Sequence, residues 1–530
     1  MNLDVISKDS HVYKAFSAMG EIFLLWIVII AKVFAFNKYI GNELDVLPSA
    51  RQFFDSSWLP NDWYLNLDIG YRQVFNYFFG LLVNWLGFLN GAYIGRLIVY
   101  LLLAFALFIF FRAINLRFSL GLIVVVVFLG NQSLIAGEWI AGGADPKTLA
   151  YAFALLSFAL FYKKKYLIGF AFAGAALSFH VLIGIYALFC TIVAILFTHG
   201  SRRQNWMALV RQSWPLFITG FFGFLAIFQQ LLPQGEIDAS KAWKIYVEFR
   251  VPHHVLPSAW QGDLWVNELI LATCLFLSIY LIIKKGSLKF TAAYALGCVS
   301  LFTIGLVIFA IGQTSLLRFY WFRYPDVMIP FLSALLVALV LNQLTYINLA
   351  DYPRMQNYLY WTQSLLSRGL PLLFALVAFL LTIQSMRFLQ GKYQRGLHRQ
   401  ISENQIASEW IKDNTPSEAV FLIDPLMNEF YTYANRARFV SFNHSPQSAV
   451  DILEWFERIT LSNGNQQPRI PVARGEIQEN YYDLNVELIQ QLVDEYGLNY
   501  YLGQAGQQLP FEQVYRDDNF TLYMIDQSSE

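Results

Sequence analysis

The first long apolar run of the chain is followed directly by a loop that is rich in carboxylates. This loop begins with "NKYIGNELDVLPSARQFFDSSWLP" at Asn37 and places Glu43, Asp45 and Arg51 close to a predicted membrane surface. A carboxylate beside apolar walls and arginines can serve as a general base, because burial raises its pKa and nearby cations lower it. The loop therefore predicts proton abstraction, with Glu43 and Asp45 as the two candidate catalytic residues.

The spacing of these two carboxylates decides whether both can reach a substrate. In an extended segment, residues two apart face the same side. On a helix they point about 200° apart, so that only one of them can line a site. We favour Asp45, because it borders the apolar turn "VLP" that follows it.

Further charged residues lie in the first loop and in the later loops that we predict on the same side of the membrane. The candidates for substrate binding are Arg51, Arg72, Glu138, Asp145, Lys147, His253, His254, Arg318 and Arg323. Charges at a membrane edge usually mark a pathway or a site, and the planar fork of arginine suits phosphate oxygens. The set favours a reaction on a lipid-linked phosphate, in which a carboxylate takes a proton and arginines hold the departing phosphate.

Each of these residues also has a simpler interpretation. The acids could belong to a solvated loop or a local salt bridge in a glycine-rich turn, and the arginines could reach for lipid headgroups. Adjacent histidines such as His253 and His254 chelate poorly unless another loop supplies ligands. A divalent metal therefore stays an open question, and no cofactor is indicated with certainty.

The elements that would position these residues are membrane spans. The chain has 530 residues, of which 56% are hydrophobic and 14% charged, whereas soluble domains are about a quarter charged. Eleven segments are apolar enough to span a bilayer: 20–36, 92–111, 118–135, 148–162, 166–179, 182–198, 214–232, 266–283, 289–311, 325–343 and 369–388. The segment 73–89 contains Asn76 and Asn84 and is either a twelfth span or a helix in the interface.

Basic residues between the spans set the orientation through the positive-inside rule. The basic clusters are Lys8/Lys14, Arg112/Arg117, Lys163–Lys165, Arg202/Arg203/Arg211, Lys284/Lys285/Lys289 and Arg354/Arg368. They all fall on one face if 73–89 does not cross, so we interpret 73–89 as interfacial or re-entrant. This predicts a cytoplasmic N-terminus, with the first loop (37–91) and the tail outside. The net charge of zero gives no sign of nucleic-acid binding.

The tail differs from the rest of the chain in composition. We expect a multi-spanning domain over 1–388 and a soluble α/β domain over 389–530. A helix should end near Asn414, helices should cover 445–459 and 484–497, and strands should cover 419–423, 437–442, 499–503 and 520–526. The predicted fold class is mainly α: a polytopic helical bundle of about eleven spans with a C-terminal extracytoplasmic α/β domain.

This order of elements resembles the GT-C superfamily of membrane glycosyltransferases, which includes oligosaccharyltransferases, protein O-mannosyltransferases and aminoarabinose transferases. The segments "GGADPKTLAYAFAL", "RVPHHVLPSAW" and "NRARFVSFNHSPQSAVDILEWFERI" look like a group of bacterial multi-spanning proteins of this architecture whose substrates are largely undefined. The resemblance implies a bacterial cytoplasmic (inner) membrane protein and an inverting transfer of sugar from a polyprenyl-phosphate-linked donor. The acceptor would be a lipid, a glycan or a protein at the outer face, and Glu43 or Asp45 matches the family's first-loop base.

The sequence departs from that superfamily in two places. It lacks the Trp-Trp-Asp acceptor motif of oligosaccharyltransferases, and it has Glu-Leu-Asp where O-mannosyltransferases commonly have an adjacent acidic pair. The acceptor is therefore open, as are membrane protein partners beside the membrane lipids. Two other functions stay in view: a non-catalytic scaffold or assembly factor of this architecture, and a transporter. A transporter is disfavoured because there is neither an internal repeat nor a cluster of charges at mid-span.

Overall fold

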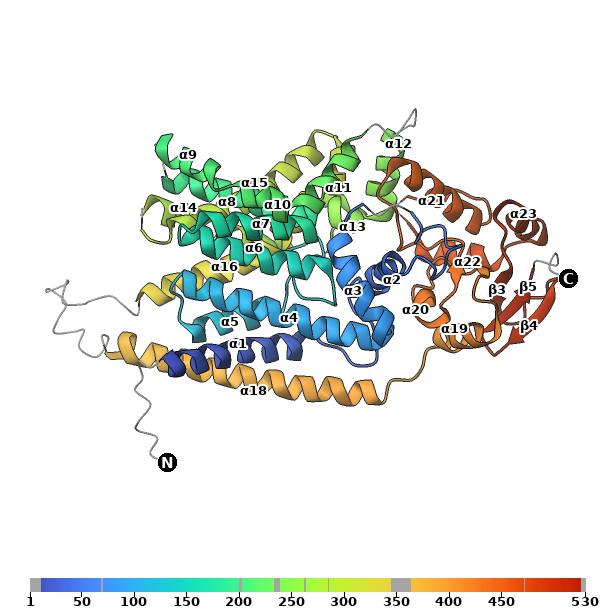
Figure 1. Ribbon diagram of the computed structural model, residues 1–530, viewed down its shortest axis with the longest axis horizontal. Helices are drawn as coiled ribbons and strands as arrows, with labels where there is room; N and C mark the ends of the chain where they lie inside the picture. Colours follow the sequence, from blue (N-terminus) through green and yellow to red (C-terminus); the bar gives the residue numbers. More distant parts are fainter. Residues whose placement is uncertain are drawn as a thin grey trace.

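A computed structural model describes residues 11–67, 70–199, 203–232, 239–261, 264–284, 286–344, 364–470 and 472–525. The molecule is elongated, with a bundle of long apolar helices at one end and a smaller layer of helices and strands at the other (Figure 1). Lys8, Arg202, Lys285 and Arg354, which contribute to the predicted basic clusters, lie outside the described residues.

Seven helices in the described part of the chain are long and apolar enough to cross a membrane. They are α1 (His11–Val33), α4 (Phe88–Ala113), α8 (Val181–His199), α14 (Leu264–Ile283), α15 (Lys289–Ala310), α16 (Arg323–Leu344) and α18 (Leu370–Leu397). Four shorter apolar helices accompany them: α5 (Phe118–Phe128), α6 (Pro146–Tyr162), α7 (Tyr166–Phe179) and α11 (Phe221–Leu231). The chain is an integral membrane protein, and these helices coincide with the eleven predicted segments.

Two of the predicted spans are interrupted. The segment 118–135 leaves the helix at Phe128, and the segment 214–232 divides at Gly220 into α10 (Trp214–Thr219) and α11. Helix α7 crosses here at close range, since a Cβ on Gly174 would lie 2.7 Å from the backbone nitrogen of Gly220. Apolar composition predicted both segments, but it does not register such a close approach of two backbones. Helix α9 (Arg203–Arg211) precedes this pair.

The first loop forms two helices, α2 (Glu43–Phe54) and α3 (Gln73–Leu86). They pack tightly on each other, because a Cβ on Gly80 would lie 2.2 Å from the carbonyl oxygen of Ala50. Helix α3 runs across the direction of α4 at the bundle end that faces the smaller layer (Figure 1). It also leaves Tyr77 and Trp85 exposed while it buries Phe79. This placement supports the interpretation of 73–89 as an interfacial helix. Which face of the membrane the first loop and the C-terminal layer occupy stays a prediction.

The smaller layer follows α18 and contains one mixed sheet. Its strands are β1 (Val420–Leu422), β2 (Ala437–Arg438), β3 (Tyr500–Gln504), β4 (Glu512–Arg516) and β5 (Phe520–Met524). The order is β2-β1-β3-β5-β4, in which β1 is parallel to β2 and β3, and β5 is antiparallel to β3 and β4. The helices are α19 (Glu403–Asn414), α20 (Phe430–Ala434), α21 (Ala449–Ser462), α22 (Arg474–Tyr482) and α23 (Val486–Tyr496).

The expected strands at 419–423, 499–503 and 520–526 correspond to β1, β3 and β5, but the expected strand 437–442 pairs only over β2. Strand β4 was not predicted, because the sequence "EQVYR" is a partly exposed edge strand without an alternating apolar pattern. Predicted helix 484–497 ends as expected at Gly497, which has a φ of 63° and closes α23. That positive φ is the conformation in which glycine commonly ends a helix.

Short helical segments fill the junction between the bundle and this layer. They are α12 (Ala239–Ile245), η2 (Tyr246–Arg250), α13 (Pro252–Val255), η3 (Pro257–Ala259) and η4 (Thr314–Phe319). Helix α12 packs on α21 of the layer, and η4 packs on α12, η2 and α15. Side chains from the first loop, the bundle and the layer therefore meet at this junction.

Candidate functional site

Asp45 lies in the first turn of α2 and retains access to solvent. Its side chain is 28% exposed, and its Oδ2 accepts a hydrogen bond from Arg72 Nη1 at 3.3 Å. Its Oδ1 accepts from the Tyr64 hydroxyl at 3.2 Å. Burial opposes ionisation, but the permanent charges of Arg72 and Arg250 outweigh it and lower the pKa of Asp45. Asp45 is therefore an ionised, hydrogen-bonded carboxylate at neutral pH, and it remains accessible.

Glu43 occupies a closed environment on the same helix. Its side chain is fully buried, and its oxygens accept from Arg96 Nε at 2.7 Å and from Arg96 Nη2 at 2.5 Å. The backbone amides of Ile40 and Ala144 donate to the same carboxylate at 2.9 and 2.8 Å. The helical spacing that separates Glu43 from Asp45 therefore sends one carboxylate inward to join the loop to α4 and leaves the other at the junction.

The C-terminal layer completes the surroundings of Asp45. His444 lies 4.0 Å from Asp45 Oδ1 and donates from Nε2 to the carbonyl oxygen of Leu44 at 3.0 Å. Burial lowers the pKa of His444 to about 4 despite the nearby charge of Asp45, so this imidazole is neutral at pH 7. Arg250 donates from Nη2 to the carbonyl oxygen of Asn443 at 2.7 Å. Both contacts tie the layer to the junction, one at Leu44 and one at Arg250.

A second ionic group lies deeper in the junction around Glu138. This carboxylate is 1% exposed and accepts from Arg323 Nε at 2.7 Å and from Lys147 Nζ at 3.2 Å. His254 Nδ1 lies 3.7 Å from it and donates to the carbonyl oxygen of Ala136 at 2.7 Å. Burial disfavours the charge of Glu138, but Arg323 and Lys147 more than compensate and hold its pKa well below the usual range. Arg323 and Lys147 outnumber Glu138 by one charge, and the carboxylate of Asp326 lies on the backbone amide of Glu138 at 3.0 Å.

Aromatic faces hold the cations of this group in place. Lys147 Nζ lies 3.2 Å from the centre of the Trp139 ring, and Arg323 lies 3.7 Å above Tyr320. The Tyr320 hydroxyl is 3.0 Å from the hydroxyl of Tyr246. The charges of Arg323 and Arg72 both act on His180 and, after burial, lower its pKa.

Two further carboxylates, Asp326 and Asp145, accept hydrogen bonds from backbone amides close to Glu138 and Lys147. Asp326 accepts from the backbone amides of Ile135, Ala136 and Glu138 at 2.6 to 3.0 Å, which fixes the loop that carries Glu138. Asp145 caps α6, since its side chain accepts from the amide of Lys147 at 3.0 Å. Asp145 was predicted as a substrate-binding residue, and it is 2% exposed in this capping position.

The remaining predicted binding residues lie at the margins. Arg318 packs on Trp243 at 3.8 Å. His253 is exposed beside His254, with their ring centres 4.0 Å apart. Arg51 lies near the C-terminal end of α2 and donates to Asn435 Oδ1 at 2.8 Å. The structure thus forms two groups from the predicted residues. Asp45 and Arg72 form the first, and the second consists of Glu138, Lys147, His254 and Arg323. Arg51 belongs to neither group.

Three arginines of the junction keep an unused donor. Among the described side chains, the Nε atoms of Arg72 and Arg250 and the Nη1 atom of Arg318 are buried without a hydrogen-bond acceptor. Buried polar groups are usually paired, so each unpaired donor needs an explanation such as a missing anion. Of these three arginines, Arg72 contacts the accessible carboxylate of Asp45 directly.

A divalent metal does not fit the described residues. They contain no group of three or more His, Cys, Asp or Glu side chains that could hold an ion. Glu43, Glu138 and Asp45 are each engaged by arginine, which leaves no set of free carboxylate oxygens for a hard cation.

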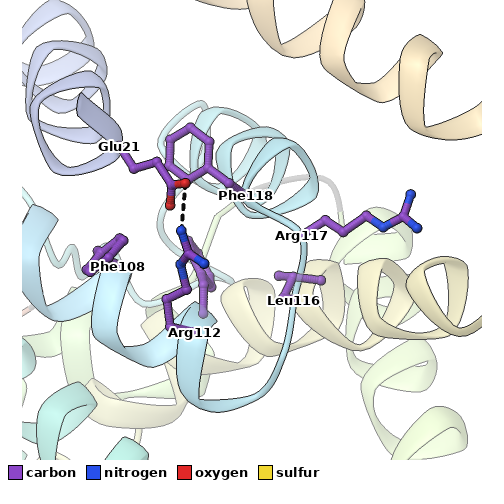
Figure 2. Close-up of a pocket in the computed structure, with 7 residues that line it drawn as sticks. Glu21, Phe108, Arg112, Leu116, Arg117 and Phe118 are labelled. Carbon is purple, nitrogen blue, oxygen red and sulfur yellow. Dashed lines mark hydrogen bonds and ion pairs between the residues drawn. The ribbon is translucent and has the colours of Figure 1, made fainter. Parts of the chain in front are cut away.

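A cavity of about 120 Å³ lies at the end of the bundle that is far from the C-terminal layer (Figure 1). Figure 2 shows that Glu21 of α1 reaches Arg112 of α4 across it, at 2.7 Å, while Arg117 points away from this pair. The Arg112 side chain is 57% exposed. Exposed ion pairs contribute about 0–1 kcal/mol, so this pair is a minor contact between two helices.

Several residues of the junction were not predicted as site residues. Arg96 lies inside an apolar span, and Tyr64, Arg250 and His444 come from three distant segments. A buried arginine within a span is a signal that can be read, because such a charge needs a partner. His444 gives a weaker signal, as a polar residue that directly follows a buried extended segment.

Comparison with known proteins shows similarity in fold. A family model described as a domain of unknown function (DUF6798) matches residues 402–461. No curated protein matches the chain. A crystal structure of ArnT from Cupriavidus metallidurans in the apo state is 12% identical, with a TM-score of 0.48, over 97% of this chain and 98% of that chain.

The Archaeoglobus fulgidus oligosaccharyltransferase tethered to an acceptor peptide is 10% identical, with a TM-score of 0.50, over 93% of this chain and 70% of that chain. Its apo form gives 9% identity and the same TM-score and coverage. The similarity extends across both the bundle and the C-terminal layer. The chain therefore shares its overall fold with this oligosaccharyltransferase, as the predicted GT-C-like architecture implies.

Proposed function

We propose that this protein is a membrane glycosyltransferase that moves a sugar from a polyprenyl-phosphate-linked donor to a lipid, glycan or protein acceptor. The reaction would occur at the outer face of a bacterial cytoplasmic membrane, with the N-terminus inside. One observation carries the proposal. Asp45 is an accessible, ionised carboxylate, and Arg72 and Arg250, which act on it, each keep a buried unpaired donor.

The proposed chemistry is an inverting displacement at the anomeric carbon. The acceptor O–H or N–H gives its proton to Asp45, and the freed electron pair forms the new bond to the anomeric carbon. The bond from that carbon to the phosphate oxygen breaks, and the oxygen leaves with its electrons. Hydrogen-bond donors that already point to the departing group stabilise its charge without having to reorganise.

The arginines provide those donors. Arg72 holds Asp45 through Nη1 and has Nε free, so it can orient the base and contact the substrate together. Arg318 and Arg323 were predicted to hold the phosphate, and the unpaired Nη1 donor of Arg318 supports that role. Glu43 is assigned a structural role that joins the first loop to α4, because its carboxylate is enclosed by Arg96 and two backbone amides.

The proposal can be tested with the purified full chain in liposomes. Polyprenyl-phosphate-linked sugars extracted from bacteria fed with radiolabelled sugar are supplied as the donor, together with extracted membrane lipids and glycans as acceptors. We expect the label to leave the polyprenyl-phosphate fraction with wild-type protein, and the rate to fall at least a hundredfold with Asp45→Asn. A stable complex with the lipid donor and no transfer under any of these conditions would favour the scaffold function instead.

A further inference from the structure

Basic side chains from two helices gather at the end of the bundle that faces the C-terminal layer. Helix α18 runs along one edge of the bundle and packs mainly on α1 and α5 (Figure 1). Lys32 lies in the last turn of α1, and Lys392 and Arg395 lie in the last two turns of α18. Lys38 follows α1 at the start of the first loop. These four residues form the α18 cationic group.

Three of these cations converge on one exposed aromatic ring. Lys392 Nζ lies 4.9 Å from the centre of the Phe388 ring. Lys32 Nζ lies 5.9 Å and Arg395 Cζ lies 6.0 Å from the same centre. The charge of Lys38 also acts on Lys392. Like charges this close repel one another, and partly buried charges are screened less by salt than exposed ones. The ring attracts each cation, but it has no net charge to offset their repulsion.

The described residues provide no carboxylate that offsets this charge. No residue from 22 to 42 and none from 352 to 402 is acidic, so neither helix end has a local counter-ion. None of the described acids forms an ion pair with the group within 4 Å. Lys392 donates to the carbonyl oxygen of Lys32 at 2.6 Å, which occupies one of the three donors of its ammonium. Positive charge and donors therefore remain for an external anion.

The position of the group runs against the charge pattern of the other membrane edges. In the predicted orientation this end of the bundle is external, where the positive-inside rule predicts few basic residues. A lysine that only reaches for water extends away from the bundle, whereas Lys392 turns back to the end of α1 and joins other cations. An anion bound among the cations would explain why they gather.

The side of α18 that carries this charge also has an apolar surface. Four side chains on that side are exposed: Leu373, Leu380, Phe388 and Arg395. Successive residues of a helix are rotated by about 100°, so these four lie within about 80° of one another around the axis. An apolar line thus leads along the helix to the cations, and basic sites between membrane helices bind the headgroups of anionic phospholipids.

We propose that the α18 cationic group binds the phosphate of an anionic phospholipid, whose acyl chains lie along Leu373 and Leu380. Lys392 and Arg395 contact the phosphate, and Lys32 and Lys38 add to the positive charge around it. This inference goes beyond the proposed sugar transfer and does not depend on it, because lipid binding is measured without any reaction.

The test uses the full chain in detergent and native mass spectrometry with two probes of identical acyl chains, phosphatidylglycerol and the zwitterionic phosphatidylcholine. We expect wild-type protein to bind the first phosphatidylglycerol at least tenfold more tightly than phosphatidylcholine. Lys392→Gln/Arg395→Gln should weaken phosphatidylglycerol binding at least tenfold and leave phosphatidylcholine binding unchanged. Arg395→Gln alone should weaken it about fivefold, since each basic residue near a lipid surface contributes about that factor. The single variant changes an exposed side chain and decides the outcome if the double variant does not fold.

Arg112→Gln is the matched control. Arg112 also stacks on an aromatic ring, that of Phe108 at 5.4 Å, but Glu21 already pairs with it. This variant should bind phosphatidylglycerol like wild type, and a loss equal to that of Arg395→Gln would overturn the proposal.

Three other results would also contradict the proposal. Wild-type protein could bind both probes equally, or folded Arg395→Gln could bind phosphatidylglycerol like wild type. A polyprenyl phosphate that displaces phosphatidylglycerol at a tenfold lower concentration than a second phosphatidylglycerol would assign the site to a polyprenyl lipid instead.

Discussion

Glu43 and Asp45 lie two residues apart, and the structure predicts opposite consequences for replacing them. Glu43→Gln keeps the size of the side chain but leaves the buried guanidinium of Arg96 without its counter-charge. The new amide group also faces a backbone N–H of Ile40 or Ala144, because glutamine offers one oxygen where glutamate offers two. Removal of one partner from a buried ion pair costs about 3–5 kcal/mol.

Asp45→Asn should cost far less stability. Its side chain is 28% exposed and its contact with Arg72 spans 3.3 Å, so solvent screening limits the loss to about 1 kcal/mol. The assay is thermal unfolding of the full chain in detergent, followed by the fluorescence of its 14 tryptophans. We expect Glu43→Gln to lower the midpoint by on the order of 3–5 °C and Asp45→Asn to change it little.

Glu21→Gln is the matched control, since Glu21 pairs with a largely exposed arginine and should lower the midpoint little. Transfer of sugar, measured below the unfolding midpoint of each variant, completes the comparison. Glu43→Gln should retain transfer while Asp45→Asn loses it. A Glu43→Gln variant that is as stable as wild type but inactive would refute this division of roles and make Glu43 the base.

Three further outcomes follow from the packing and the charges. Gly80→Ala should destabilise the chain by about 1–3 kcal/mol or more, because its Cβ would lie 2.2 Å from the carbonyl oxygen of Ala50, whereas Gly20→Ala in open space should not; thermal midpoints test both. Burial lowers the pKa of His444 to about 4, so the unfolded chain binds a proton on this imidazole more tightly than the folded chain does. The free energy of unfolding should therefore fall by up to about 3 kcal/mol as the pH drops from about 6.5 to 4. In His444→Asn, the thermal midpoint should decrease less between pH 7 and pH 5 than it does in wild type. Glu138→Gln should cost about 3–5 kcal/mol by leaving its two paired cations uncompensated, and an unchanged midpoint would contradict that expectation.

The sequence predicted the helical bundle well because a lipid environment demands long apolar segments, and these are visible in composition alone. It predicted helix breaks poorly, as at Gly220, because a break depends on how closely another helix approaches. In the C-terminal layer, the buried strands β1, β3 and β5 were visible as apolar runs, and the polar edge strand β4 was not.

In the candidate site too, contacts between side chains from distant segments could not be predicted from the local sequence. The acidic character of the first loop was visible, but the choice between Glu43 and Asp45 depended on helix phase and on Arg96, which lies on a different span. Glu138 and Arg323 were both candidates, yet their pairing joins residues 185 positions apart and no local pattern reports it. His444 reaches Asp45 only because the C-terminal layer folds back onto the first loop.

The central claim is that Asp45 takes the proton of the acceptor during sugar transfer. Its most direct test is a single-turnover measurement with the radiolabelled polyprenyl-phosphate donor already bound to the full chain in liposomes. Asp45→Asn should bind the donor like wild type and transfer its sugar at least a hundredfold more slowly, which is the lower part of the usual range of about 10²–10⁴ for a general base. Transfer at the wild-type rate by folded Asp45→Asn with bound donor would contradict the account.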